Sequence, residues 1–331
     1  MPRLRIDVGG KPLLDIASYA RRGPSRRDRL STEELELIRR TVQRTPEVMV
    51  KVLPKGGRDL GSVRRHLAYI SRYGELELQA DNEAMVGKGT ERGLVENWDL
   101  DIEENRRRAD LGARRDRRPP KLVHKFLFSM PPGTPAKKVL EAVKNFAREE
   151  FALKHRYALV LHTDEPHPHV HFVIKAVSEQ GVRLHIRKET LRQWRRQFAR
   201  HLQDQGVPAN ATERAVRGQT RTHKTDGIFR AARRGASTHI RKRAEDLARE
   251  LSEGDVLQHQ ASEARLLKTR GEVESGWRAI GKELSREGQP ELAAEVMRFV
   301  DEFRLPRTEK ELLAHESLVF GGELRGPLHH H

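Results

Sequence analysis

The chain contains no cysteine among its 331 residues. This excludes disulfide-stabilised scaffolds and thiolate zinc sites, so His, Asp and Glu are the strong metal ligands that remain. Aromatic residues make up only 5% of the sequence, and four of them are tyrosines. No hydrophobic run is long enough to span a membrane or to form a signal peptide, and we therefore expect a cytoplasmic protein without membrane insertion.

Positive charge, in contrast, is abundant. The 64 Lys and Arg residues outnumber the 48 Asp and Glu residues, which gives a net charge of +16. The excess is concentrated in residues 183–234, where fourteen Lys or Arg stand against four acidic residues, a local balance of +10. A basic segment of this density indicates a polyanion partner, although a solvated helical face remains the alternative when the segment is considered alone.

The length predicts about two domains, and Gly and Pro clusters divide the chain into three parts. Residues 1–45 are predicted to be a basic, flexible extension with one short helix at 32–43. Residues 46–234 should form the main domain and include the basic helix region. Residues 235–325 are predicted to be helical, with a break at 287–290 that suggests a helical hairpin. The terminal Leu-His-His-His is expected to be the remnant of a purification tag.

Apolar residues at strand and helix spacing predict the elements of the main domain. Strands are expected at 48–53, 122–129, 157–161, 170–176 and 182–186. Helices are expected from an Asp59 N-cap as far as Gly74, at 91–109 as an exposed helix or insertion, after a Thr134 N-cap, and over 191–202. This order predicts an α/β sandwich, in which an antiparallel sheet carries helices on one face and is followed by an α-helical region. The other face of the sheet should be open.

Four histidines and one aspartate lie within the ten residues HTDEPHPHVH, 162–171. Side chains on a strand alternate between its two faces, so His169 and His171 share a face. An antiparallel hairpin would bring His162 beside them as a third nitrogen, with Asp164 close enough to orient an imidazole. The pattern predicts a metal site built from imidazoles on the open face of the sheet. The alternative is a surface hairpin with scattered histidines.

A metal held by neutral imidazoles keeps its full positive charge, which suits it to polarising a phosphodiester oxygen. Such chemistry also needs a nucleophile, and Tyr69 is the candidate among the four tyrosines. It is predicted at the edge of an apolar helical stripe, with Arg65 and His66 one turn before it and Arg72 three residues after it. Cationic neighbours favour a nucleophilic phenol. These residues alone leave open a boundary tyrosine with a hydrated hydroxyl.

Three segments together resemble a known family. HTDEPHPHVH is similar to the third motif of the HUH endonucleases, in the relaxase branch that includes plasmid mobilisation proteins and the T-DNA border nuclease. LAYISRYGELEL, 67–78, resembles the first motif of that branch, and FSMPPGT, 128–134, resembles its second. The segments occur in the family's order within about residues 48–190. The resemblance therefore implies a palm-like HUH core.

The resemblance implies a conjugative relaxase that nicks one DNA strand at a transfer origin and later rejoins it. Tyr69 aligns with the family's nucleophile and would attack the scissile phosphate, leaving a 5′-phosphotyrosine adduct and a free 3′-OH. His162, His169 and His171 would hold the metal. Asp164 would orient an imidazole or accept the tyrosine proton.

Other residues are expected to contact DNA. The resemblance places Ser129 near the strand beyond the nick, and it makes His167 a reserve metal ligand or base. Tyr73 lies one turn beyond Tyr69, and we expect it to stack on a base or to pack rather than to act as a second nucleophile. The cations predicted to contact DNA, through phosphates rather than base edges, are Arg65, Arg72, Arg192, Arg195, Arg196 and Arg200.

The implied cofactor is a divalent metal, Mg²⁺ or Mn²⁺, with other transition ions able to substitute in vitro. The implied partners are single-stranded DNA at a transfer origin, relaxosome accessory proteins and a type IV secretion coupling protein. The protein would act in the bacterial cytoplasm and could be carried into a recipient cell bound to DNA.

Three alternatives remain at this point. A replication initiator or transposase of the HUH class would use similar chemistry, but its tyrosine usually follows its histidines, whereas Tyr69 precedes them here. A non-catalytic, metal-containing DNA-binding accessory protein would bind DNA without forming an adduct. A histidine-metal hydrolase of small phosphoesters would have no use for the basic segment.

Overall fold

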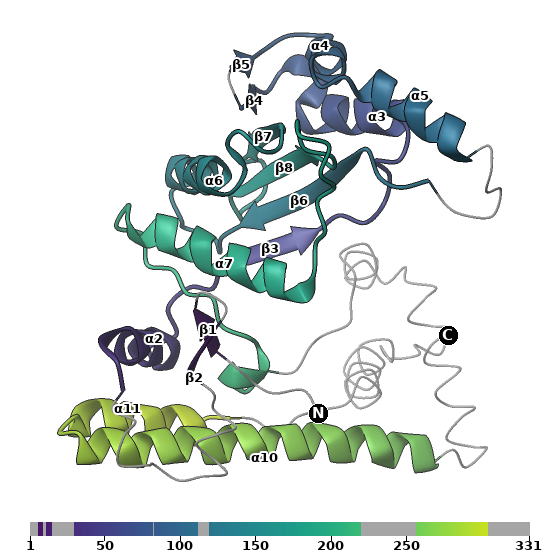
Figure 1. Ribbon diagram of the computed structural model, residues 1–331. Coiled ribbons are helices and arrows are strands. Elements are labelled where there is room, and N and C mark those ends of the chain that lie inside the picture. The colour runs from purple at the N-terminus through teal and green to yellow at the C-terminus, as the bar shows by residue number, and fades with distance from the viewer. Residues whose placement is uncertain are drawn as a thin grey trace, which may run out of the picture. The chain divides into compact units, whose positions relative to one another are not determined.

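The computed structural model describes residues 6–8, 11–14, 30–81, 83–111, 119–219 and 256–303 (Figure 1). The chain divides into two compact units, one of residues 44–211 with 8–11 and the other of residues 1–7, 12–43 and 212–331. A separate two-stranded sheet consists of β1 (Ile6–Val8) and β2 (Lys11–Leu14). Within the described ranges, no helix combines the length and the apolar character that crossing a bilayer requires.

Six antiparallel strands form the main sheet, in the order β3-β6-β8-β7-β4-β5. They are β3 (Met49–Val52), β4 (Leu78–Ala80), β5 (Ala84–Met85), β6 (Val123–Ser129), β7 (Tyr157–His162) and β8 (His169–Lys175). The antiparallel sheet predicted from the sequence is therefore confirmed. The strand expected at 182–186 is wrong, because Arg183 forms only an isolated bridge with Val177.

One face of the sheet is covered by α6 (Ala136–Phe151) and α7 (Lys188–Gln203) (Figure 1). An aromatic cluster fills the space between these helices and the strands. Phe128 lies at its centre, with ring centroids 5.1 to 5.7 Å from those of Phe146, Phe172 and Phe198. Burial of such large side chains makes this layer the main hydrophobic core of the unit.

The predicted starting point of α6 is shifted by one residue. The Thr134 hydroxyl donates to the Pro131 carbonyl at 2.9 Å, and Pro135 takes the cap position without a side-chain cap bond. The helix predicted over 191–202 is confirmed as part of α7, and its side chains Trp194 and Leu202 are fully buried against the sheet. These helices match the expectation that helices cover one face of the sheet.

The second face is not open, which corrects the sequence expectation. Here α3 (Leu60–Ile70) packs Val63, Leu67 and Ile70 against sheet residues that include Val160 and Val173. The helix begins where predicted, because the Asp59 carboxylate accepts from the Ser62 amide at 2.7 Å. An apolar helical stripe needs a partner surface, and this face of the sheet supplies one.

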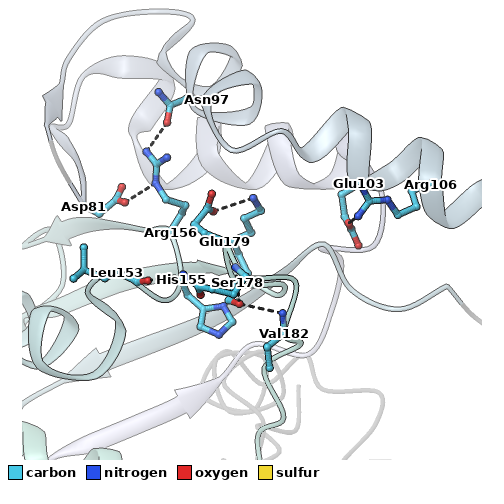
Figure 2. A network of polar contacts seen from close by, with 12 residues as sticks. Asp81, Asn97, Glu103, Arg106, Leu153, His155, Arg156, Ser178, Glu179 and Val182 are labelled. Atoms are coloured by element: carbon cyan, nitrogen blue, oxygen red, sulfur yellow. Dashed lines mark hydrogen bonds and ion pairs between the residues drawn. The ribbon is translucent and has the colours of Figure 1, made fainter.

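The charged region after β5 forms two helices, α4 (Thr90–Asn97) and α5 (Leu100–Leu111), rather than one exposed helix. Leu94 and Trp98 are buried in the core beneath α3. Arg156, at the start of β7, pairs with Asp81 and donates to the Asn97 side chain, as Figure 2 shows. These contacts attach the α4 region to the edge of the sheet.

The second unit has its own core. It consists of α2 (Thr32–Val42), a short 3₁₀ turn at Ala215–Arg217, α10 (Val256–Arg286) and α11 (Pro290–Asp301). Ile38, Trp277 and Val296 are fully buried together, and the Trp277 indole donates to the Val216 carbonyl at 2.8 Å.

The short N-terminal helix and the break at 287–290 are thus confirmed. The three-part division at residues 45 and 234 stays a prediction. Helix α2, which the sequence assigns to the N-terminal extension, packs with α10 and α11 in one core. Residues 220–255, which hold the last part of the basic 183–234 segment, lie outside the described residues.

Candidate active site

The predicted histidine hairpin is formed by β7 and β8. Its register sets His162 opposite His169 and Val160 opposite His171. The three imidazoles therefore converge on one face, with ring centroids 4.6 to 5.4 Å apart. Each offers one nitrogen, and these nitrogens lie within 4.8 Å of one another. We call His162, His169 and His171 the histidine cluster.

Hydrogen bonds fix the tautomers of two members of the cluster. A carbonyl oxygen can only accept, so Nε2–H of His162 donates to Ile70 at 2.6 Å and Nδ1–H of His169 donates to His167 at 3.0 Å. The opposite nitrogens, Nδ1 of His162 and Nε2 of His169, are left with lone pairs. Carbonyl partners of this kind usually orient histidines that bind metal.

Two members of the cluster, His162 and His171, have lowered pKa values that favour the neutral ring. Burial, followed by the neighbouring imidazoles, lowers the pKa of His171 to about 3. Burial also lowers the pKa of His162. The Nδ1 of His171 is buried without a hydrogen-bond partner. Three imidazoles with converging nitrogens fit a divalent transition ion, which binds the deprotonated ring.

Helix α3 places Tyr69 beside this cluster. The next residue, Ile70, supplies the carbonyl that holds His162, so the C-terminal end of α3 rests directly on the histidines. Tyr69 itself is 53% exposed, which leaves its hydroxyl open to a large substrate. The guanidinium of Arg72 lies 5.4 Å from the centroid of the Tyr69 ring.

Arg72 connects Tyr69 to Asp164, with which it forms an ion pair. Burial alone would lower the pKa of Arg72, but its interactions with Tyr69 and Asp164 raise it. Burial likewise opposes ionisation of Asp164, yet its backbone hydrogen bond and the Arg72 contact keep its pKa below the usual value. The Asp164 carboxylate also lies 3.8 Å from Nδ1 of His162, at the edge of the cluster.

Tyr73 does not share a helical face with Tyr69. The predicted continuation of the helix as far as Gly74 is wrong. Helix α3 ends at Ile70, and a 3₁₀ turn follows in which Arg72 and Tyr73 have φ of 52° and 57°. Left-handed backbone at two successive non-glycine residues is rare and carries strain. The turn leaves the Tyr73 side chain 71% exposed.

A close backbone contact supports this turn. Gly74 has a φ of 92°, and a Cβ at this position would lie 2.2 Å from backbone atoms of Gly87. The Gly87 amide donates to the Gly74 carbonyl at 3.0 Å, and the Ser71 hydroxyl accepts from the Gly74 amide at 3.3 Å. Only glycine can occupy this position without displacing the neighbouring loop.

Two further predicted residues differ in their placement. Ser129 ends β6 directly opposite His169, so it lies on the same face as the cluster, and it is 5% exposed. His167 is exposed, and its carbonyl rather than its ring contacts the cluster. The described structure therefore groups three histidines, with the reserve ligand outside the group.

The predicted DNA-contacting arginines lie in two places. Arg65 is exposed on α3, the helix whose end contacts the histidine cluster. The four arginines of α7 lie on the opposite layer of the sheet, where Arg192 pairs with Glu189 and Arg200 with Glu149. Their predicted role in binding DNA stays a prediction.

Two further residues, His66 and Lys125, face the cluster side, although the sequence indicates His66 only as a neighbour of Tyr69 and indicates no role for Lys125. His66 is partly buried on α3 beside the stripe of Val63, Leu67 and Ile70, and its ring centroid is 6.1 Å from that of His171. Burial, followed by the charge of Lys125, lowers the pKa of His66 to about 4. Lys125 is only 7% exposed on β6. The available signal for His66 was a histidine at helical spacing from the apolar residues Val63 and Ile70.

Comparison with known proteins agrees with this geometry. Residues 79–207 match the family described as relaxase, MobA/VirD2-like, nuclease domain. Over these residues the chain is therefore similar to relaxase nuclease domains of the MobA and VirD2 type. The matched region includes the histidine hairpin and begins after Tyr69.

Three relatives of this domain carry the name T-DNA border endonuclease VirD2. The chain is 28% identical to that of Rhizobium radiobacter over 188 residues, which is 52% of this chain and 43% of the relative. It is 26% identical to that of Agrobacterium fabrum over 223 residues, 63% of this chain and 49% of the relative. For Rhizobium rhizogenes the values are 26% over 234 residues, 63% and 50%. The chain thus spans half or less of their length, and no solved structure matches it.

Proposed function

We propose that this chain is a metal-dependent DNA relaxase that nicks single-stranded DNA at a transfer origin and can rejoin the strand. One observation carries the proposal: the end of α3 brings a half-exposed tyrosine, Tyr69, next to a cluster of three histidines whose nitrogens converge. The family match of the sheet domain and the VirD2 relatives support the same activity.

His162, His169 and His171 would hold the divalent metal, Mg²⁺ or Mn²⁺, because their nitrogens converge and burial lowers the pKa of His162 and His171. When bound, such an ion would polarise the scissile phosphate and stabilise the negative charge of the transition state. Ile70 and His167 contribute carbonyls that keep two of these rings oriented.

Tyr69 is the proposed nucleophile. Its hydroxyl oxygen would form the new bond to phosphorus as the bond from phosphorus to the 3′ oxygen breaks, giving a 5′-phosphotyrosine and a 3′-OH. Arg72 would stabilise the negative charge that develops on the phenol oxygen, and Asp164, which Arg72 connects to Tyr69, would accept the phenol proton. The same adduct permits rejoining, because attack by a 3′-OH reverses the step.

The exposed groups around Tyr69 suit a single strand. Tyr73 offers a ring on which a base can stack, and Arg65 offers a cation to the backbone. Ser129 lies beside His169, where it would contact the strand beyond the nick. We propose that the α7 arginines add sequence-independent affinity for phosphates.

We also propose a compartment and partner proteins for this reaction. A relaxase of this kind would act in the bacterial cytoplasm with relaxosome accessory proteins. It would then pass to a type IV secretion coupling protein while attached to the cut strand. These partners would be recovered only with protein that has formed its adduct or bound its origin DNA.

The test uses single-stranded fragments tiled across the replicon that encodes the chain. After incubation with Mn²⁺, one fragment should give an adduct that survives denaturing electrophoresis, and chelation of the metal should prevent it. Binding without adduct on every fragment, with Mg²⁺ and with Mn²⁺, would instead identify a non-catalytic accessory protein. Release of inorganic phosphate from small esters would identify a phosphoesterase.

A further inference from the structure

The three members of the histidine cluster are not held equally. His162 and His169 each donate their second ring nitrogen to a carbonyl, whereas Nδ1 of His171 is buried and has no partner. A ring with one nitrogen unsatisfied is free to rotate or to exchange tautomers. A ligand of this kind needs an acceptor that fixes the N–H side of its ring.

A second buried nitrogen without a partner faces His171 from α3. It is Nε2 of His66. The two rings meet edge to face, with centroids 6.1 Å apart and planes at 71°. No direct hydrogen bond joins the two nitrogens, and a water between them would give each its missing partner. The charge of Lys125 acts on His66 and, after burial, lowers the pKa of its ring.

The placement of His66 is unusual for its helix. Its neighbours on the buried side of α3 are Val63, Leu67 and Ile70, all of which pack on the sheet. An apolar residue at position 66 would extend that packing. An imidazole there instead supplies a polar atom at the one point where the sheet presents His171.

We infer that His66 is a positioning residue for His171: its Nε2 accepts, through one bridging water, the Nδ1–H of His171. The carbonyls of Ile70 and His167 already accept from His162 and His169, so this contact would give the third ring an acceptor as well. Nε2 of His171 is then directed toward the other two histidines. The inference rests on the proposed metal site. It adds a residue of α3, directly before the first motif, to the support of the metal.

The experiment compares His66→Phe and His66→Leu, which cannot accept a hydrogen bond, with His66→Gln, which can. Affinity for Co²⁺ or Mn²⁺ is measured by calorimetry on the full chain, and the visible spectrum of bound Co²⁺ reports the ligand geometry. Phe and Leu should lower the affinity by about 10- to 100-fold and shift the spectrum, whereas Gln should recover most of both. His124→Phe, at a partly buried histidine on the other face of β6, is the matched control and should change neither.

The outcomes separate the two claims. If the wild-type chain binds neither ion, the metal site of the proposed function is wrong. If the wild type binds and the Phe and Leu variants stay within twofold of it with an unchanged Co²⁺ spectrum, the role of His66 is wrong and the site stands. Melting temperatures and circular dichroism confirm folding, and the inference fails equally if Gln behaves like Leu.

Discussion

The two faces of the main sheet are built from the same strands but have different chemistry. In β8, Val170, Phe172 and Ile174 point into the aromatic core beneath α6 and α7, whereas His169 and His171 point toward α3. The first face is apolar. The second also has an apolar core beneath α3, but it holds buried polar groups as well and ends in an exposed tyrosine.

This difference indicates a division of labour. Large apolar side chains on the α6–α7 face supply the stability, because burial of apolar area is the dominant favourable contribution to folding. The α3 face can then carry neutral imidazoles and a strained turn, both of which weaken folding. Substitutions on the two faces should therefore have separable effects.

The largest expected effect is on Tyr69, at the edge of the α3 face. Tyr69→Phe removes the oxygen nucleophile and should abolish the covalent adduct, while binding of single-stranded DNA stays within about threefold because the ring is kept. Tyr73→Phe is the matched control and should retain the adduct. Electrophoresis of denatured reactions measures both. Adduct in the Tyr69 variant with none in the Tyr73 variant would reverse the assignment.

The next effect concerns the histidine cluster. His171→Ala should lower metal affinity and nicking by at least about 100-fold, because a ligand is lost. Its melting temperature without metal should change little, because the ring has no fixed partner for Nδ1. Calorimetry and scanning fluorimetry measure these quantities. Undiminished nicking in chelated wild-type protein would make the cluster structural.

The opposite face should behave in the reverse manner. Phe128→Ala removes a fully buried ring and should lower the free energy of unfolding by about 3–5 kcal/mol. Metal affinity should remain close to wild type at temperatures where the variant is folded. Urea denaturation measures the free energy of unfolding, and calorimetry on the folded variant measures metal affinity. Loss of metal binding in the folded variant would show that the faces are coupled.

A smaller effect is expected for the cations of α7. Replacing the four arginines with Gln should reduce the slope of log affinity against log salt by about 1–3 units, since each lost phosphate contact contributes about 0.7 for single strands. The position of the nick should not move. The residues changed are Arg192, Arg195, Arg196 and Arg200. An unchanged slope would mean that α7 faces solvent and that the DNA runs along the α3 face alone.

The smallest effect is the pH dependence of stability without metal. The pKa values of His66 and His124 are lowered to about 4 and that of His171 to about 3. The unfolded chain binds more protons than the folded one below pH 6.5, so stability falls as pH drops from about 6.5 toward 4. The melting temperature should thus decrease by several degrees between pH 7 and 5, and His124→Gln should reduce the decrease. A flat or rising profile would contradict neutral buried imidazoles.

The hairpin and its cluster could be predicted from the sequence because they depend on short-range rules. Period-two alternation sets His169 and His171 on one face, and an antiparallel return brings His162 to them. The ends of the strands follow from the same pattern. No long-range information was needed for this part of the site.

Other features depend on contacts between distant segments. The apolar stripe of α3 could pack on either face of the sheet, so its position over the histidines, with Ile70 and His66 touching them, was not predictable. The left-handed turn at Arg72 and Tyr73 depends on the approach of Gly87. The packing of α2 with α10 and α11 joins residues far apart in the sequence.

The central claim is that the α3 face carries out strand cleavage through Tyr69. The most direct test is to digest the denatured adduct with trypsin and nuclease and to locate the remaining nucleotide by mass spectrometry. The account predicts a nucleotide attached through its 5′-phosphate to Tyr69, in the peptide that begins after Arg65. A nucleotide on Tyr73 or on a residue outside α3, or attachment through a 3′-phosphate, would contradict it.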